Sequence, residues 1–185
     1  MEPIDQLSYI LPTVSMTVGH IVPSQLTAAT PCSEFRVQDL LDHLMVGGDM
    51  FAARFRGEEA TPNGHDPVDG VVPAAAFRTT MEGLLASVKS PGAMERTISA
   101  PIGEVPGSVM ARFAAFDVLM HGWDLAQATD QPYELPPVVV AAVDEFARTA
   151  LTPEMRDGDT FKDETTPPDD ASQLERLVAF SGRSL

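Results

Sequence analysis

The sequence predicts a mainly α-helical protein, a four-helix bundle with long connections and a short C-terminal extension. Apolar residues recur at the three- and four-residue spacing of one helix face in four or five separate stretches, and strand-type alternation is scarce. Amphipathic helices of this length bury their apolar faces by packing against one another. The length of 185 residues suits one domain, which we expect to span residues 1–185.

The first two predicted helices are separated by a turn. An apolar stripe predicts a helix over residues 4–22, which Pro12 should bend or divide because it lacks a backbone N–H group. Residues 29–36 are rich in turn-forming side chains. The second helix is expected from about Val37 to Phe55 and should stop at Gly57.

Two long connections flank the third predicted helix. Residues 58–72 contain several Pro and Gly residues and predict an irregular loop, after which Pro73 is placed to open a helix that ends near Val88. Residues 94–105 predict an extended arm or a short hairpin. Because both connections are long, helices that are consecutive in the sequence need not be antiparallel neighbours in space.

The last third of the chain begins with the clearest helix. Ser108 is a suitable N-cap for it, and the helical spacing continues to about Thr129. Pro136-Pro137 then predicts the start of a further helix. The acidic residues of 153–170 indicate a surface loop, and residues 174–180 are expected to form a short closing element.

The composition excludes several classes of partner. The chain has 12 Lys and Arg against 27 Asp and Glu, a net charge of −15, whereas nucleic acids and anionic membranes require clustered basic residues. We find no apolar run long enough to span a bilayer and no basic, secretion-type start. Cys32 is the single cysteine, which rules out an internal disulfide. We therefore expect a cytoplasmic protein without nucleic-acid or membrane partners.

Two of the predicted helices each carry a histidine and a carboxylate on one face. Asp117 and His121 are four residues apart, as are Asp39 and His43, so each pair emerges about 5–6 Å apart. Asp124 falls on the same side of its helix as His121. Two histidines and one carboxylate from facing helices suit a divalent transition metal and leave a coordination position open. The candidate ligands are His43, Asp117 and His121.

Each candidate also has a structural interpretation. An Asp and a His four residues apart on a helix more often form a surface hydrogen bond than a metal site, and Asp39 suits the first turn of its helix. We interpret His20 and His65 as solvated. Cys32, in a turn without a histidine beside it in the sequence, is interpreted as a small buried apolar residue rather than a nucleophile.

Two segments resemble the signatures of a known family. Residues 30–44, TPCSEFRVQDLLDHL, resemble the first signature of the DinB-like metal-binding proteins. More narrowly, they resemble the branch related to mycothiol-dependent maleylpyruvate isomerase, which is common in actinobacteria. Residues 116–129, FDVLMHGWDLAQAT, resemble the second signature, and residues 177–183 resemble the end of the shorter members. The resemblance therefore covers most of the chain.

The resemblance implies a DinB-like four-helix bundle with one divalent ion, usually zinc or nickel. The family's ligand positions fall on His43, Asp117 and His121, the same three residues that the helical spacing selects. The sequence departs from the family at Phe35, where tryptophan is usual, at Arg36, where threonine is usual, and at Asp117, where the isomerases have glutamate. The isomerases also have a C-terminal domain that 185 residues are too few to hold.

These observations predict a thiol-dependent (mycothiol-type) S-transferase or isomerase. The metal would activate a low-molecular-weight thiol, which would attack a small electrophilic substrate. Asp124 or Asp39 would orient a ligand histidine. With water in the open position the same site would suit a hydrolase. A non-catalytic metal-binding or stress-related interaction module, a non-haem iron oxygenase and a homodimeric assembly are left open.

Overall fold

The structure, a computed structural model, describes residues 1–59, 70–100, 103–156 and 161–185. It is mostly helical, which confirms the predicted mainly α class. Its contacts divide the chain into two compact units, residues 2–134 and residues 135–185 together with Met1. The single domain over residues 1–185 stays a prediction. His65 and most of the predicted loop over 58–72 lie outside the described residues.

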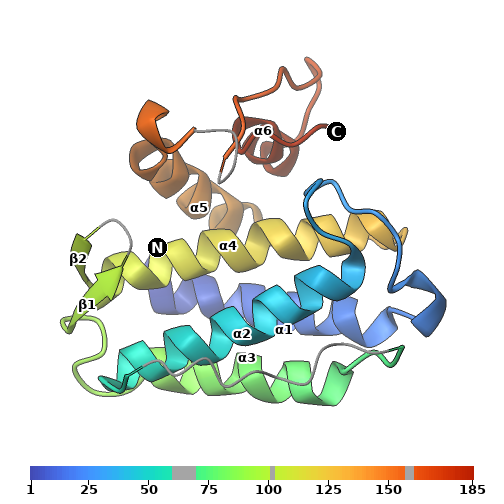
Figure 1. Ribbon diagram of the computed structural model, residues 1–185. Coiled ribbons are helices and arrows are strands. Elements are labelled where there is room, and N and C mark those ends of the chain that lie inside the picture. The colour runs from blue at the N-terminus through green and yellow to red at the C-terminus, as the bar shows by residue number, and fades with distance from the viewer. Residues whose placement is uncertain (60–69, 101–102, 157–160) are drawn as a thin grey trace. The chain divides into compact units, whose positions relative to one another are not determined.

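Residues 2–134 contain the four-helix bundle (Figure 1). Its helices are α1 (Pro3–His20), α2 (Val37–Arg56), α3 (Ala74–Val88) and α4 (Gly107–Ala128), with a short 3-10 turn, η1 (Pro23–Gln25), after the first. Helix α1 packs against α3 and α4, and α2 packs against the same two helices. The order around the bundle is therefore α1–α4–α2–α3. Helices α1 and α2, consecutive in the sequence, lie at opposite corners, as the long connections allow.

The inward faces of the four helices form the core of the bundle. Burial of each large apolar side chain contributes about 1.5–3 kcal/mol relative to exposure, so this face dominates the stability. The largest fully buried side chains include Leu7, Ile10, Leu11, Leu40, Leu41, Leu44, Phe55, Phe77, Met81, Leu84 and Leu119. Within the described ranges, we find no helix with the length and hydropathy needed to cross a membrane.

Helix α1 runs through Pro12 without interruption, so of the two predicted effects of this proline the division of the helix is wrong, and a bend stays a prediction. Pro12 is exposed, and water can therefore satisfy the carbonyl group that has lost its intrahelical donor. Its neighbours Leu11 and Val14 are fully buried and keep the helix packed on either side. At the end of α2, Gly57 adopts the left-handed conformation with φ 77°, as predicted for a helix stop.

The predicted hairpin lies directly before α4. Strand β1 (Thr97–Ala100) pairs antiparallel with β2 (Gly103–Pro106), and the register sets Ile98 opposite Val105. Ile98 is buried, so the hairpin has an inner side. The hairpin matters for the site because β2 runs without a break into α4, the helix that carries Asp117 and His121.

The start of α4 differs from the prediction by two residues. The helix begins at Gly107, with Pro106 at the N-cap, and Ser108 lies inside its first turn. The N–H groups of Gly107 and Ser108 donate to the carbonyl oxygens of Arg96 and Met94, each over 2.8 Å. The segment before the hairpin therefore satisfies the first two N–H groups of the helix with backbone carbonyl oxygens, and no serine N-cap is used.

Residues 135–185 form a smaller helical unit. It contains α5 (Pro137–Ala150), the 3-10 turn η2 (Pro153–Met155) and α6 (Gln173–Phe180), and α5 packs against α6. The helix predicted after Pro136 is confirmed as α5, and the short closing element is the helix α6. The chain between them is mainly loop in the part that the structure describes. Ser172 caps α6, since its hydroxyl accepts a hydrogen bond from the N–H group of Glu175.

Candidate metal centre

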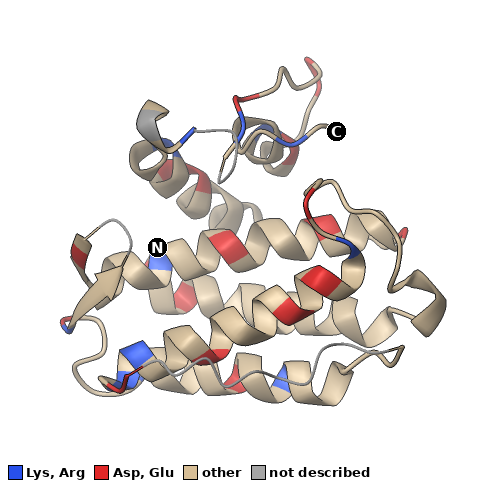
Figure 2. Ribbon diagram, viewed as in Figure 1, with Lys and Arg blue, Asp and Glu red and all other residues tan. Residues whose placement is uncertain are grey.

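The packing of α2 against α4 brings the three predicted ligands together. The Oδ1 atom of Asp117 lies 3.6 Å from Nε2 of His43 and 3.5 Å from Nε2 of His121. The centroids of the two imidazole rings are 4.9 Å apart. Figure 2 shows acidic residues along both of these helices. Two histidines from different helices thus converge on one carboxylate.

The donor atoms of this cluster fit a single cation. One ligand atom each from His43, Asp117 and His121 lies within 4.8 Å of the other two. Imidazole nitrogen and carboxylate oxygen suit zinc, nickel and related divalent ions, and three protein ligands leave a position for water or substrate. The side chains of His43 and Asp117 are 39% and 32% exposed, whereas that of His121 is 10% exposed. The cluster is therefore open to solvent beside His43.

The charge on Asp117 affects the neighbouring imidazole. The pKa of His43 is raised above 6.5, chiefly by its hydrogen bond with Asp117, while burial opposes the shift. The contact favours the protonated ring, which is not a metal ligand. A cation that binds here must displace this proton, so metal affinity depends on pH.

Asp124 holds His121 from the side opposite to Asp117. Its Oδ2 atom lies 3.0 Å from Nδ1 of His121, and the residue is completely buried. A carboxylate at Nδ1 keeps the proton on that nitrogen and directs the Nε2 lone pair towards the cluster. Burial and the negative charge of Asp124 both raise the pKa of Tyr133, whose hydroxyl donates to the carbonyl oxygen of Leu119 over 3.1 Å.

Asp39 lies at the N-terminus of α2. Its Oδ2 atom accepts a hydrogen bond of 2.8 Å from the N–H group of Arg36, the N-cap residue. Arg36 makes no capping bond through its own side chain, as expected for a residue without an acceptor. This geometry suits the interpretation of Asp39 as a first-turn acid, and its orientation of His43 stays a prediction.

The loop before α2 brings two residues to the cluster that the sequence analysis did not place there. The ring of Phe35 lies 5.4 Å from that of His43 and 6.0 Å from that of His121, between centroids. Cys32 lies beside His121 and Asp124, with its Sγ atom within 4.8 Å of a ligand atom of each. The fold thus gives Cys32 the histidine neighbour that the sequence does not show. The sequence signal that could have placed Cys32 and Phe35 near the cluster is their position in the turn directly before the helix of His43.

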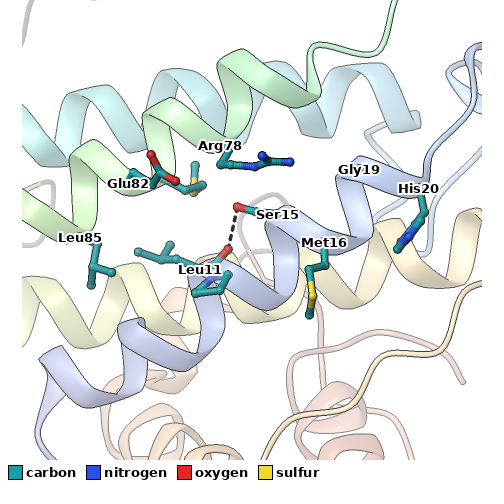
Figure 3. Close-up of a pocket in the computed structure, with 10 residues that line it drawn as sticks. Leu11, Ser15, Met16, Gly19, His20, Arg78, Glu82 and Leu85 are labelled. Atoms are coloured by element: carbon teal, nitrogen blue, oxygen red, sulfur yellow. Dashed lines mark hydrogen bonds between the residues drawn. The ribbon is translucent and has the colours of Figure 1, made fainter.

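A cavity of about 420 Å³ lies between α1 and α3 and does not include the cluster (Figure 3). Its wall contains apolar side chains such as Leu11 and Met81, together with Arg78 and Glu82 from α3. His20, at its edge, is exposed, as predicted. The candidate ligands are absent from its lining, so this cavity is not the predicted metal site.

Comparison with known families shows to which family the chain belongs. Residues 14–126 match the family described as "Mycothiol maleylpyruvate isomerase N-terminal domain". The chain belongs to this family. The matched range contains His43, Asp117 and His121, so all three candidate ligands lie in the part that this family shares.

Two similar proteins occur in Mycobacterium tuberculosis. An uncharacterized protein of strain CDC 1551 and one of strain H37Rv are each 34% identical over 169 residues, covering 91% of this chain and 90% of the relative. Among solved structures, the chain is similar to a mutant of the mycothiol-dependent maleylpyruvate isomerase, with a TM-score of 0.58 and 13% identity. That match covers 77% of this chain and 66% of the isomerase, just under two thirds, and it supports the shared fold.

Proposed function

We propose that the protein is a metal-dependent enzyme of the mycothiol-dependent type. It joins a low-molecular-weight thiol to a small electrophilic substrate, as an S-transferase or an isomerase. The observation that carries this proposal is the convergence of His43, Asp117 and His121 on one solvent-accessible point. Family membership supports the choice of thiol, since the matching family is described by its mycothiol isomerase.

The cluster has two properties that such an enzyme needs, ligands for a metal ion and an exposed side that a substrate can reach. His43, Asp117 and His121 would hold a zinc or nickel ion, which would supply a thiol or water of lowered pKa as a nucleophile near neutral pH. Asp124 keeps His121 in the tautomer whose Nε2 is a donor. The half-exposed His43 lies on the side from which a thiol can approach.

Phe35 limits how water reaches the cluster. Its ring lies near both imidazoles and covers part of their surface. Water exclusion strengthens the electrostatic interactions in the site and reduces the competition of bulk water with the thiol. We do not propose maleylpyruvate itself as the substrate, because the solved isomerase is only 13% identical and 34% of its chain lies outside the match.

The decisive experiment combines metal analysis with a thiol assay. We expect the purified protein to bind about one divalent ion per chain. As an S-transferase it should consume mycothiol in the presence of small electrophiles such as activated aryl halides, and as an isomerase it should require mycothiol without consuming it. His43→Ala should lose both properties. His20→Ala, which removes an exposed histidine lining the α1–α3 cavity, should keep both.

Two results would contradict the proposal in different ways. A protein that binds no divalent ion, or binds it equally well as His43→Ala, has no metal centre at this cluster. A protein that binds the ion through His43 and turns over no thiol with any electrophile is a metal-binding module, the alternative that the sequence left open.

A further inference from the structure

A second set of metal-ligand types lies directly behind the first. Cys32, from the loop before α2, and His121 and Asp124, from α4, place a sulfur, a nitrogen and an oxygen within 4.8 Å of one another. His121 is common to both sets, but its two nitrogens face different carboxylates. Its Nε2 is 3.5 Å from Asp117, and its Nδ1 is 3.0 Å from Asp124.

The two sets differ in charge and in burial. With its metal bound, the outer set of His43, Asp117 and His121 contributes one negative charge, and two of its side chains are about one third exposed. The inner set of Cys32, His121 and Asp124 contributes two negative charges, from the Cys32 thiolate and the Asp124 carboxylate. It therefore neutralises a divalent cation. Asp124 is completely buried and His121 is 8% exposed, whereas Cys32 is partly exposed, unlike the buried residue that the sequence predicted. Charge neutrality counts most at such a buried position, because an uncompensated charge there is costly.

The loop holds Cys32 in place without any ion. The carbonyl oxygen of Cys32 accepts a hydrogen bond of 2.9 Å from the N–H group of Phe35. The hydroxyl of Thr30, a buried residue, lies 3.0 Å from the carbonyl oxygen of Cys32 and 2.8 Å from that of Phe35. These bonds close a tight turn, so little conformational entropy is lost when the thiol binds a cation.

We propose that Cys32, His121 and Asp124 form a second metal position that binds thiophilic divalent cations such as cadmium. Thiolate sulfur selects soft cations over hard ones, and the outer set has no sulfur ligand. On binding, the thiol proton leaves to solvent and the Nδ1 proton of His121 is transferred to Nε2, so the imidazole stays neutral and the set carries two negative charges. The metal at the inner position therefore changes the imidazole that the outer position also uses.

The test uses cobalt and cadmium as probes on the full chain after chelator treatment. Cobalt bound to a thiolate gives an intense near-ultraviolet charge-transfer band, whereas cobalt bound only by nitrogen and oxygen does not. We expect this band in the parent and in His43→Ala, and its loss in Cys32→Ser. In the His43→Ala background, we also expect Cys32→Ser to bind cadmium at least about tenfold more weakly, since even the loss of a residue that only hydrogen-bonds to a metal ligand has that effect.

Each contrary result overturns the inference. Absence of the band in the parent shows that Cys32 binds no metal. Loss of the band in His43→Ala as well as in Cys32→Ser shows that Cys32 completes the outer site instead of forming an inner one. Circular dichroism establishes that Cys32→Ser is folded. In the His43→Ala background, Asp124→Asn, which keeps the size of the side chain, should weaken cadmium binding as well. Because the readout is made in His43→Ala, it does not depend on the outer site or on turnover.

Discussion

His121 and Asp124 are joined by a contact of 3.0 Å between Nδ1 and Oδ2, and the carboxylate has no solvent-exposed surface. The two residues are three positions apart on α4, so the helix itself fixes their relative position. His43 is more exposed, and its Nε2 atom lies 3.6 Å from Oδ1 of Asp117. Of the two histidines in the cluster, His121 is therefore the more firmly oriented before any metal binds.

Replacement of Asp124 by asparagine should weaken metal binding without unfolding the protein. Asparagine keeps the size of the side chain but removes the charge that holds the Nδ1 proton, and such partners are worth about 10- to 100-fold in metal affinity. Competition with a chromogenic chelator measures the effect. Asp39→Asn is the matched control, since Asp39 bonds the N–H group of Arg36. It should cost about 0.5–1 kcal/mol of stability and leave the affinity unchanged.

The pH dependence of the metal-free protein should follow the contact between His43 and Asp117. Because the folded pKa of His43 is raised above 6.5, the contact stabilises the fold fully below that pH, and the contribution is lost as the pH rises through the raised pKa. NMR titration of the His43 ring should give a midpoint above 6.5. Asp117→Asn should lower the midpoint, because the hydrogen bond to the carboxylate is the main cause of the shift.

Metal binding should have the opposite dependence on pH. Protons and cations compete for His43, so affinity should increase as the pH rises through the raised pKa of this ring. Calorimetric titration with zinc from about pH 5 to about pH 8 spans the range in which histidine changes charge. An affinity that is constant over this range would mean that His43 is not a ligand.

The outer set could be predicted because most of its residues lie close together in the sequence. Asp117, His121 and Asp124 share one helix, where spacing alone fixes which side chains meet, and only His43 had to be brought in by packing. The helices themselves followed from apolar periodicity. The apolar positions repeat over several helical turns, so the prediction of a helix does not depend on any single residue.

The features that the sequence did not reveal depend on contacts between distant segments. The position of Cys32 follows from the turn that Thr30 closes and from the packing of that turn beside α4, neither of which has a periodic signal. The start of α4 was displaced because carbonyl groups from the preceding segment, at Met94 and Arg96, satisfy its first donors. In both cases a tertiary hydrogen bond determines the local structure.

Two glycines of the bundle should respond to alanine in opposite directions. A Cβ atom at Gly122, next to His121, would lie closer than 3.0 Å to side-chain atoms of Val14 and Tyr133, whereas at Gly47 it meets nothing within 4 Å. Gly122→Ala should therefore cost about 1–3 kcal/mol of stability. Gly47→Ala should contribute about 0.5–1 kcal/mol, because alanine favours the helix. Chemical denaturation measures both, and equal effects would show that α4 does not approach α1 and Tyr133 so closely.

The ring of Phe35 should contribute to the cluster through its contacts with His43 and His121, at 5.4 and 6.0 Å between centroids. Phe35→Leu keeps an apolar side chain but removes the aromatic contacts, each worth about 0.5–1.5 kcal/mol, and should lower both stability and metal affinity. Phe35→Trp supplies the aromatic residue that is usual in the family and should retain both. Denaturation and chelator competition measure the two quantities. If the leucine variant binds metal like the parent, the ring only shields the surface, and the packing of α2 against α4 alone positions the imidazoles.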